Sequence, residues 1–132
     1  MNRFEFSTVN FLVLSIPVLL ISGPFLADTA LSISCILFLI YIVRTRQFIL
    51  FKDNFFIIFL LFYALIMISC FQSDYLEKIF FKNIFYFRFG IFLLLVKYII
   101  NKNEKFINNL KKVLMLTFII LLIDSLIQFT FG

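Results

Sequence analysis

Residues 113–131 read VLMLTFIILLIDSLIQFTF, a largely apolar run whose ionisable side chain is Asp124. A helix needs about 20 mainly apolar residues to cross about 30 Å of hydrocarbon. Backbone groups in lipid must be hydrogen-bonded within their own segment, so such a run is predicted to be a transmembrane helix. This stretch therefore indicates an integral membrane protein.

The composition of the whole chain supports the same class. Of the 132 residues, 64% are hydrophobic and 14% are charged, against about 25% charged residues in an average soluble domain. Disordered chains and nucleic-acid-binding domains need charge-rich sequence, whereas the twelve Lys and Arg here gather mainly in short connections. We expect no nucleic-acid partner, and we interpret the net charge of +5 as a topology signal.

Four boundaries divide the chain into five candidate spans. These lie at about residues 8–23, 24 or 28–43, 55–71, 83–100 and 113–131. Pro17 is expected to kink the first span, and Gly23-Pro24 to form the turn after it. The first two spans are short, which leaves a tight hairpin and a re-entrant pair as alternatives. The expected fold is an all-α membrane protein of about five transmembrane helices, forming one domain over residues 1–132.

Two connections are predicted to carry helical turns outside the hydrocarbon. Asp74 followed by Glu77 resembles a capping box, which indicates a short interfacial helix between spans three and four. The stretch 101–112 is rich in Asn and Lys and has apolar residues at helical spacing. The fifth helix is therefore predicted to begin in water, near Asn103.

Orientation follows from the Lys and Arg on alternate sides of the five spans, nine on one side and three on the other. The nine are Arg3, Arg44, Arg46, Lys52, Lys97, Lys102, Lys105, Lys111 and Lys112, and the three are Lys78, Lys82 and the intramembrane Arg88. The positive-inside rule makes the nine-residue side cytoplasmic. The amino-terminus is then inside and the carboxyl-terminus outside.

Few residues are candidates for a catalytic, metal-binding or phosphate-binding role. The chain has no His, and its two Cys, Cys35 and Cys70, lie inside apolar runs without metal-ligand spacing. No nucleophile–base set or Gly-rich phosphate loop is present in the sequence. We expect no catalytic residue, metal or cofactor in this chain.

Arg88 and Asp124 are the strongest candidates for a functional role. An ionised side chain at membrane depth costs about 2.5–3.5 kcal/mol, so each needs a partner. With spans four and five antiparallel, their depths below the outer face are roughly 8 and 12 Å. We therefore predict that they pair, and that Gln128 on the same face as Asp124 joins them in a structural polar layer.

Two interpretations of this layer remain. In one, Arg88 and Asp124 form a structural ion pair that holds two helices together. In the other, Arg88 lies just under the outer surface and binds an anionic head group such as a diphosphate.

Three segments resemble the amino-terminal part of the O-antigen ligase and O-antigen polymerase superfamily. They are Ser22-Gly23-Pro24-Phe25-Leu26, Tyr86-Phe87-Arg88-Phe89 and Asp124-Ser125-Leu126-Ile127-Gln128-Phe129-Thr130-Phe131-Gly132. The similarity covers nearly all of the chain. Only Arg88, Asp124 and Gln128 match recognisable family positions.

The resemblance implies a function in lipopolysaccharide biosynthesis. Members of that superfamily are polytopic glycosyltransferases at the periplasmic face of the bacterial inner membrane. They transfer a glycan from a polyprenyl diphosphate carrier, without a metal, and their catalytic His lies in a later periplasmic loop. This chain would then be the amino-terminal part of a longer protein. Its partners would be membrane lipid, the polyprenyl-diphosphate-linked glycan, and further carboxyl-terminal helices or other membrane subunits.

Two other classes of protein fit the same residues. A small transporter or channel subunit would use Asp124 as an ion or proton site. A structural membrane partner without chemistry would use the polar residues only to order its helices.

Overall fold

The computed structural model describes the backbone of residues 3–70 and 76–131, and the side chains of residues 6–69 and 83–130. The described chain consists of helices joined by short connections. In order they are α1 (Arg3–Ser22), α2 (Pro24–Thr45), the 3₁₀ helix η1 (Phe48–Lys52), α3 (Asn54–Cys70), α4 (Leu76–Lys102) and α5 (Lys105–Phe131). The expected all-α class is thereby confirmed.

The first turn is set by two residues of special backbone geometry. Gly23 has a φ of 138°, a conformation that residues with a Cβ rarely adopt, and its N–H donates to the carbonyl of Leu19 at 3.1 Å. Pro24 then begins α2, where a missing N–H costs nothing. The predicted turn at Gly23-Pro24 is therefore confirmed, and α1 continues through Pro17.

Three helical segments are long and apolar enough to cross a membrane: Pro24–Thr45, Asn83–Lys102 and Lys105–Thr130. Two further apolar segments, Phe6–Ser22 and Asn54–Ser69, are shorter. The chain is thus a helical membrane protein with three clear candidate spans. The expected number of about five spans is not confirmed by helix length alone.

The connections differ in part from the prediction. Residues 76–82 are the first turns of α4, so they do not form a separate interfacial helix, and the proposed cap at Asp74 lies outside the described residues. α5 begins at Lys105, whose N–H donates to Asn103 Oδ1 at 3.1 Å. The predicted start near Asn103 is therefore close to the observed one.

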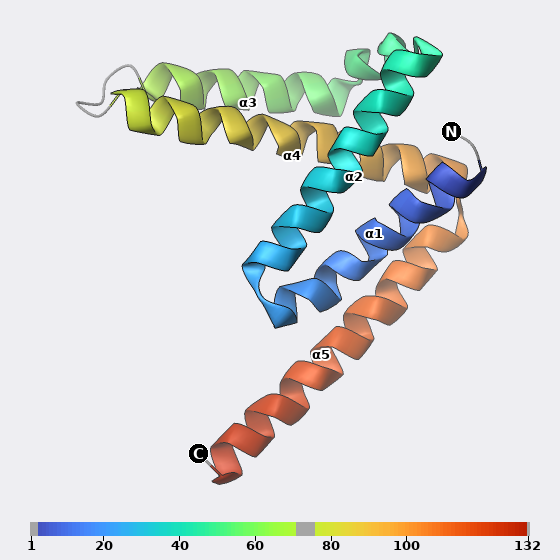
Figure 1. Cartoon of the computed structure of the whole chain (residues 1–132), viewed down its shortest axis with the longest axis vertical. Helices are drawn as coiled ribbons and strands as arrows, with labels where there is room; N and C mark the ends of the chain where they lie inside the picture. Colours follow the sequence, from blue (N-terminus) through green and yellow to red (C-terminus); the bar gives the residue numbers. More distant parts are fainter. Residues whose placement is uncertain (1–2, 71–75, 132) are drawn as a thin grey trace.

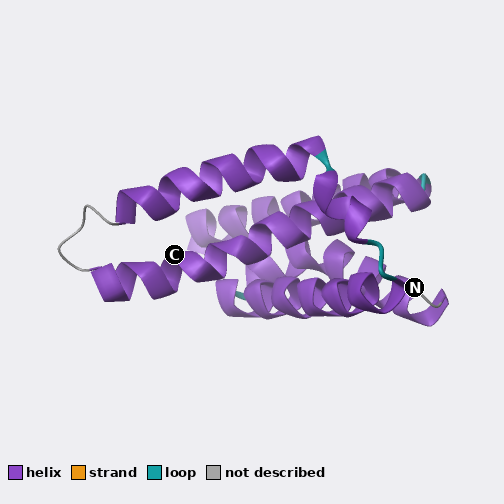
Figure 2. Cartoon of the chain, turned by 90° about the horizontal axis from the view of Figure 1, so that it is seen from above, coloured by secondary structure: helices purple, strands orange, loops and turns teal. Residues whose placement is uncertain are grey.

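The helices form two antiparallel hairpins, α1–α2 and α3–α4, with α5 packed mainly along α1 (Figure 1). α2 contacts α4 and so joins the two hairpins. The helix axes are not parallel, because α2 crosses the α3–α4 hairpin steeply (Figure 1), although the helices overlap when they are seen from above (Figure 2). Their common core includes side chains from all five α-helices, and its fully buried members are Val9, Phe38, Ile42, Leu95, Ile99 and Phe106.

Away from this core the elements diverge. α5 and the α3–α4 hairpin separate from each other toward the far end of the molecule (Figure 1). Gly90 allows α3 and α4 to approach closely, because a Cβ at this position would overlap the ring of Phe59. That ring stacks between Phe56 and Tyr63, with centroid distances of 6.3 and 6.1 Å.

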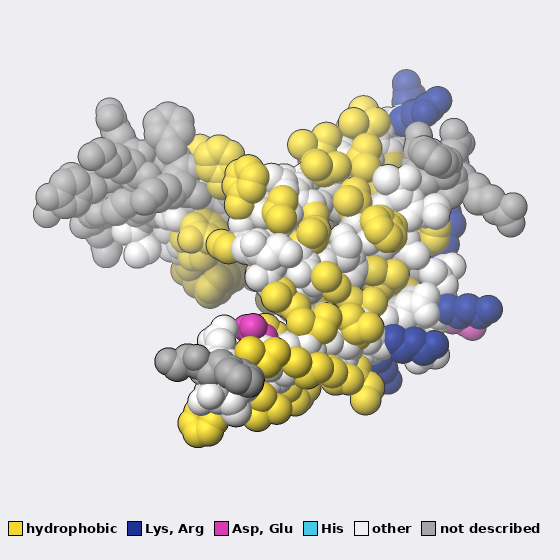
Figure 3. Space-filling model, turned by 60° about the horizontal axis from the view of Figure 1, so that its bottom comes forward, with side chains coloured by type: hydrophobic (Ala, Val, Ile, Leu, Met, Phe, Trp, Pro, Cys, Tyr) yellow, Lys and Arg dark blue, Asp and Glu magenta, His cyan; other side chains and the backbone are white. Residues whose placement is uncertain are grey.

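The Lys and Arg side chains visible in the space-filling view gather at one end of the molecule (Figure 3). At this end α2 finishes, η1 follows, and α4 leads into α5. Asp53 accepts a hydrogen bond from Lys97 here, and the Tyr98 hydroxyl donates to the Tyr41 hydroxyl at 3.0 Å. The basic connections of the sequence therefore come together in space.

Candidate functional site

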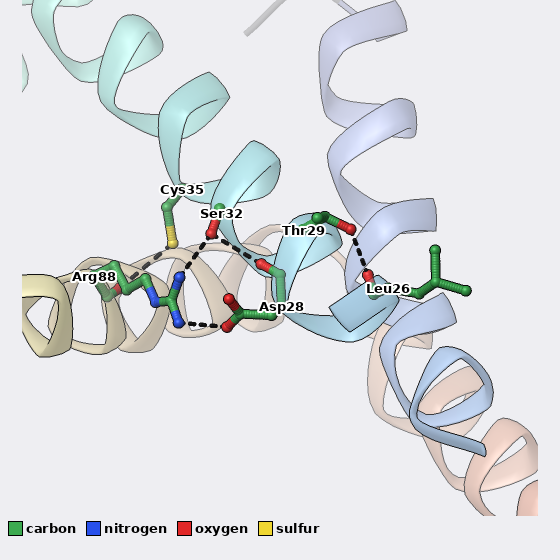
Figure 4. A network of polar contacts seen from close by, with 6 residues as sticks. All are labelled: Leu26, Asp28, Thr29, Ser32, Cys35 and Arg88. Carbon is green, nitrogen blue, oxygen red and sulfur yellow. Dashed lines mark hydrogen bonds and ion pairs between the residues drawn. The ribbon is translucent and has the colours of Figure 1, made fainter. Parts of the chain in front are cut away.

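The candidate site is a polar cluster between α2 and α4, centred on Arg88 (Figure 4). Arg88 forms an ion pair with Asp28, and its Nη1 donates to Ser32 Oγ at 3.0 Å. The Cys35 thiol donates to the backbone carbonyl of Arg88 at 3.4 Å. Residues 28, 32 and 35 follow helical spacing, which places these polar side chains on one face of α2.

The predicted pairing of Arg88 with Asp124 is wrong. The carboxylate that pairs with Arg88 is Asp28, and Asp124 instead accepts a hydrogen bond at 2.9 Å from Gln128 Nε2 on its own helix. The cause is the packing: α2 lies against α4, whereas α5 packs mainly against α1. Asp124 and Gln128 are thus together as expected, and Arg88 is bonded elsewhere.

Asp28 was not among the predicted site residues, because the sequence placed it at or near the start of the second span rather than within it. The structure places it inside α2, five residues into the helix. The sequence held a signal for this role. Asp28, Ser32 and Cys35 form a polar stripe at i, i+4 and i+7 in a largely apolar helix, and such a stripe in a membrane helix faces other protein.

The bonds of this cluster are only partly complete. The Arg88 side chain is 27% exposed and the Asp28 side chain 49% exposed. Ser32 Oγ donates to the carbonyl of Asp28 at 2.8 Å while it accepts from Arg88. Arg88 Nε is buried and has no hydrogen-bond partner among the described residues. The two terminal nitrogens of the Arg88 guanidinium are therefore held by α2, while the guanidinium still has hydrogen-bond donors that are not used.

A surface hollow adjoins this guanidinium. It has a volume of about 280 Å³ and is lined by Arg88, Phe85, Tyr86 and Phe89, all on α4. The Tyr86 and Phe89 rings stack with centroids 6.0 Å apart, and Arg88 Cζ lies 5.4 Å from the centroid of the Phe89 ring. The hollow thus combines a cation with exposed aromatic walls.

Other candidate chemistry is limited in the described part of the chain. Cys35 is buried, and the side chain of Cys70 lies outside the described residues. No group of three or more His, Cys, Asp or Glu among the described residues could hold a metal ion. At the basic end, the hydrogen bond from Lys97 holds the pKa of Asp53 below its ordinary value.

The chain has no match in three comparisons: no protein-family model, no curated protein and no solved structure is similar to it. The geometry around Arg88 and the sequence resemblance are therefore the basis for a functional proposal.

Proposed function

We propose that this chain forms the amino-terminal membrane region of a glycosyltransferase of the O-antigen ligase and polymerase type. In this proposal, Arg88 binds the diphosphate of a polyprenyl-diphosphate-linked glycan that enters from the outer leaflet. The observation that carries the proposal is the position of Arg88 in an aromatic-lined hollow, with its guanidinium held on one edge by Asp28 and Ser32.

The first step of the argument concerns charge. A diphosphate offers several anionic oxygens, and the planar guanidinium of Arg binds such groups through paired hydrogen bonds. Asp28 is about half exposed, so its carboxylate has room to move away from Arg88 when an anion binds there. Asp28 then keeps Arg88 in position while the site is empty, and a bound diphosphate supplies part of the negative charge that balances Arg88.

The second step concerns the walls and size of the hollow. Aromatic side chains offer apolar surface to the first isoprene units of the carrier. Its volume of about 280 Å³ lies near the lower limit of about 300 Å³ for small-ligand pockets. It therefore suits the diphosphate and the adjoining tail, while the glycan stays in water and the rest of the tail in lipid.

The third step concerns orientation in the bacterial inner membrane. The basic end of the molecule is cytoplasmic by the positive-inside rule. Arg88 precedes Lys102 on α4 by 14 residues, about 21 Å along the helix, which puts it in the outer half of the bilayer. α1 has 20 residues and α3 has 17, within the range of about 17–25 for a span. Five spans then place the carboxyl-terminus of the described chain in the periplasm.

The test is glycan transfer in cells that carry the complete gene with single substitutions. Arg88→Gln and Arg88→Lys should both reduce transfer at normal protein level. Gln removes the positive charge, and the Lys ammonium cannot form the paired hydrogen bonds of a guanidinium. Lys97→Gln is the matched control, since it removes a cation with an acidic partner from the other end of α4. Normal transfer by Arg88→Gln would exclude the docking role.

A charge swap separates docking from structure. Arg88→Asp combined with Asp28→Arg preserves the ion pair but moves the cation to α2. If the swap restores both protein level and transfer, the pair only holds the helices together. If it restores protein level alone, the position of the cation matters, as the proposal requires.

A further inference from the structure

One face of α5 forms a packing seam that begins at the core. Phe106 and Thr117 are buried, Leu110 and Val113 are half-buried, and the residues between them are exposed. These four positions follow a spacing of four, three and four residues, the pattern of a helix packed against a neighbour. The neighbour here is mainly α1.

The same seam continues past the end of this contact. Asp124 follows Thr117 by seven residues and therefore lies on the same face, and Gln128 comes one turn later. Every side chain described after Thr117, from residue 118 to 130, is exposed. We call Leu121, Asp124 and Gln128 the outer seam. It prolongs an existing helix–helix interface into a region where the described chain supplies no covering helix.

Asp124 cannot reach water easily from this position. It lies twelve residues beyond Lys112, about 18 Å along α5, and its short side chain cannot snorkel as Lys or Arg does. Its hydrogen bond from Gln128 Nε2 comes from a neutral amide on the same helix. Among the described residues, Arg88 is the cation with an intramembrane position, and Asp28 neutralises it. Within the described part of the chain, Asp124 therefore has no cationic partner.

We propose that the outer seam docks another transmembrane helix that carries a Lys or Arg at the depth of Asp124. The outer seam is continuous with the α1–α5 interface, and the Asp124 carboxylate is complementary in charge to the Lys or Arg of the partner helix. Gln128 adds a donor and an acceptor for polar groups on the same partner. A second copy of this chain fits less well, because a two-fold axis along α5 would bring two Asp124 carboxylates to one depth.

The proposal can be tested with the whole chain in lipid vesicles and a defined probe. The probe is a synthetic Leu-rich transmembrane helix with one Arg at the depth of Asp124, and energy transfer between labels on chain and probe measures binding. The Arg probe should bind about tenfold more tightly than an all-Leu probe. Asp124→Asn should remove this preference, while Asp28→Asn, a matched change on α2, should leave it.

Gln128→Leu is a second variant, expected to weaken binding of the Arg probe about threefold while keeping its preference over the all-Leu probe. Equal binding of the two probes, or an unchanged preference in Asp124→Asn, would overturn the proposal. The same labels on two copies of the chain test self-association. Self-association that exceeds probe binding and disappears in Asp124→Asn would also overturn it, in favour of a second copy as the occupant.

Discussion

Removal of Asp28 should destabilise the protein more than removal of Arg88. In Asp28→Ala, Arg88 keeps a bond to Ser32 but loses its counter-charge, and its side chain is only 27% exposed. Breaking a fully buried pair costs about 3–5 kcal/mol and a surface pair contributes about 0–1 kcal/mol. The intermediate exposure of this pair places the loss for Asp28→Ala at about 2 kcal/mol.

Arg88→Ala should cost about 1 kcal/mol, because Asp28 is 49% exposed and can take up water. The double variant should cost about 1 kcal/mol less than the sum of the two single losses. The measurement is unfolding of the full chain in mixed micelles, followed by helical circular dichroism over a titration with denaturing detergent.

A second double-mutant cycle, on Arg88 and Asp124, serves as the control for the cycle on Arg88 and Asp28. Arg88→Ala and Asp124→Ala should be additive to within about 0.5 kcal/mol, because these residues do not share a bond. Additive losses for Arg88 and Asp28, or strong coupling between Arg88 and Asp124, would refute the helix arrangement described above.

Three further predictions concern packing, pH and topology. Gly90→Ala should destabilise by about 1–3 kcal/mol, because the new methyl group overlaps the Phe59 ring; Phe59→Ala combined with Gly90→Ala should recover part of this loss in the same unfolding assay. Since the pKa of Asp53 is lowered on folding, its stabilising contribution is present above the ordinary value of 3.8 and is lost as pH falls further. Melting midpoints between pH 6 and 3 should therefore decline less in Asp53→Asn than in the wild type, and parallel curves would contradict this. In a Cys-free background, Cys placed at Asn103 and at Ser73 should label from opposite sides with an impermeant thiol reagent, and periplasmic labelling at position 103 would overturn the predicted topology.

The sequence predicted those features of the fold that depend on local chemistry. Gly23 and Pro24 mark the first turn because few other residues accept a φ of 138° followed by a helix start without an N–H. Asn103 marks the start of α5 because its side chain can accept from a nearby backbone N–H. Such signals act over a few residues and can be recognised in a single sequence.

Helix pairing could not be predicted in the same way. Arg88 and Asp124 were predicted to pair because their estimated depths in the membrane are similar. A similar depth does not specify which helix packs against which side of α4. The outcome depends on long-range packing such as the approach of Gly90 to Phe59 and the burial of Phe38 against Tyr98. The first turn of α5 also carries Phe106 into the core, although its Asn and Lys neighbours predicted a solvated stretch.

The two intramembrane carboxylates differ in how they tolerate the loss of a partner. Asp28 lies four residues after Pro24, about 6 Å along α2 from its first residue, and it is half exposed. Water or lipid head groups can therefore solvate it when Arg88 is replaced. Asp124 lacks such a position, because it lies twelve residues beyond Lys112, about 18 Å along α5, among largely apolar neighbours on that helix. Arg88→Gln should consequently leave the protein folded, so a loss of glycan transfer in that variant would report on binding by Arg88 rather than on collapse of the bundle.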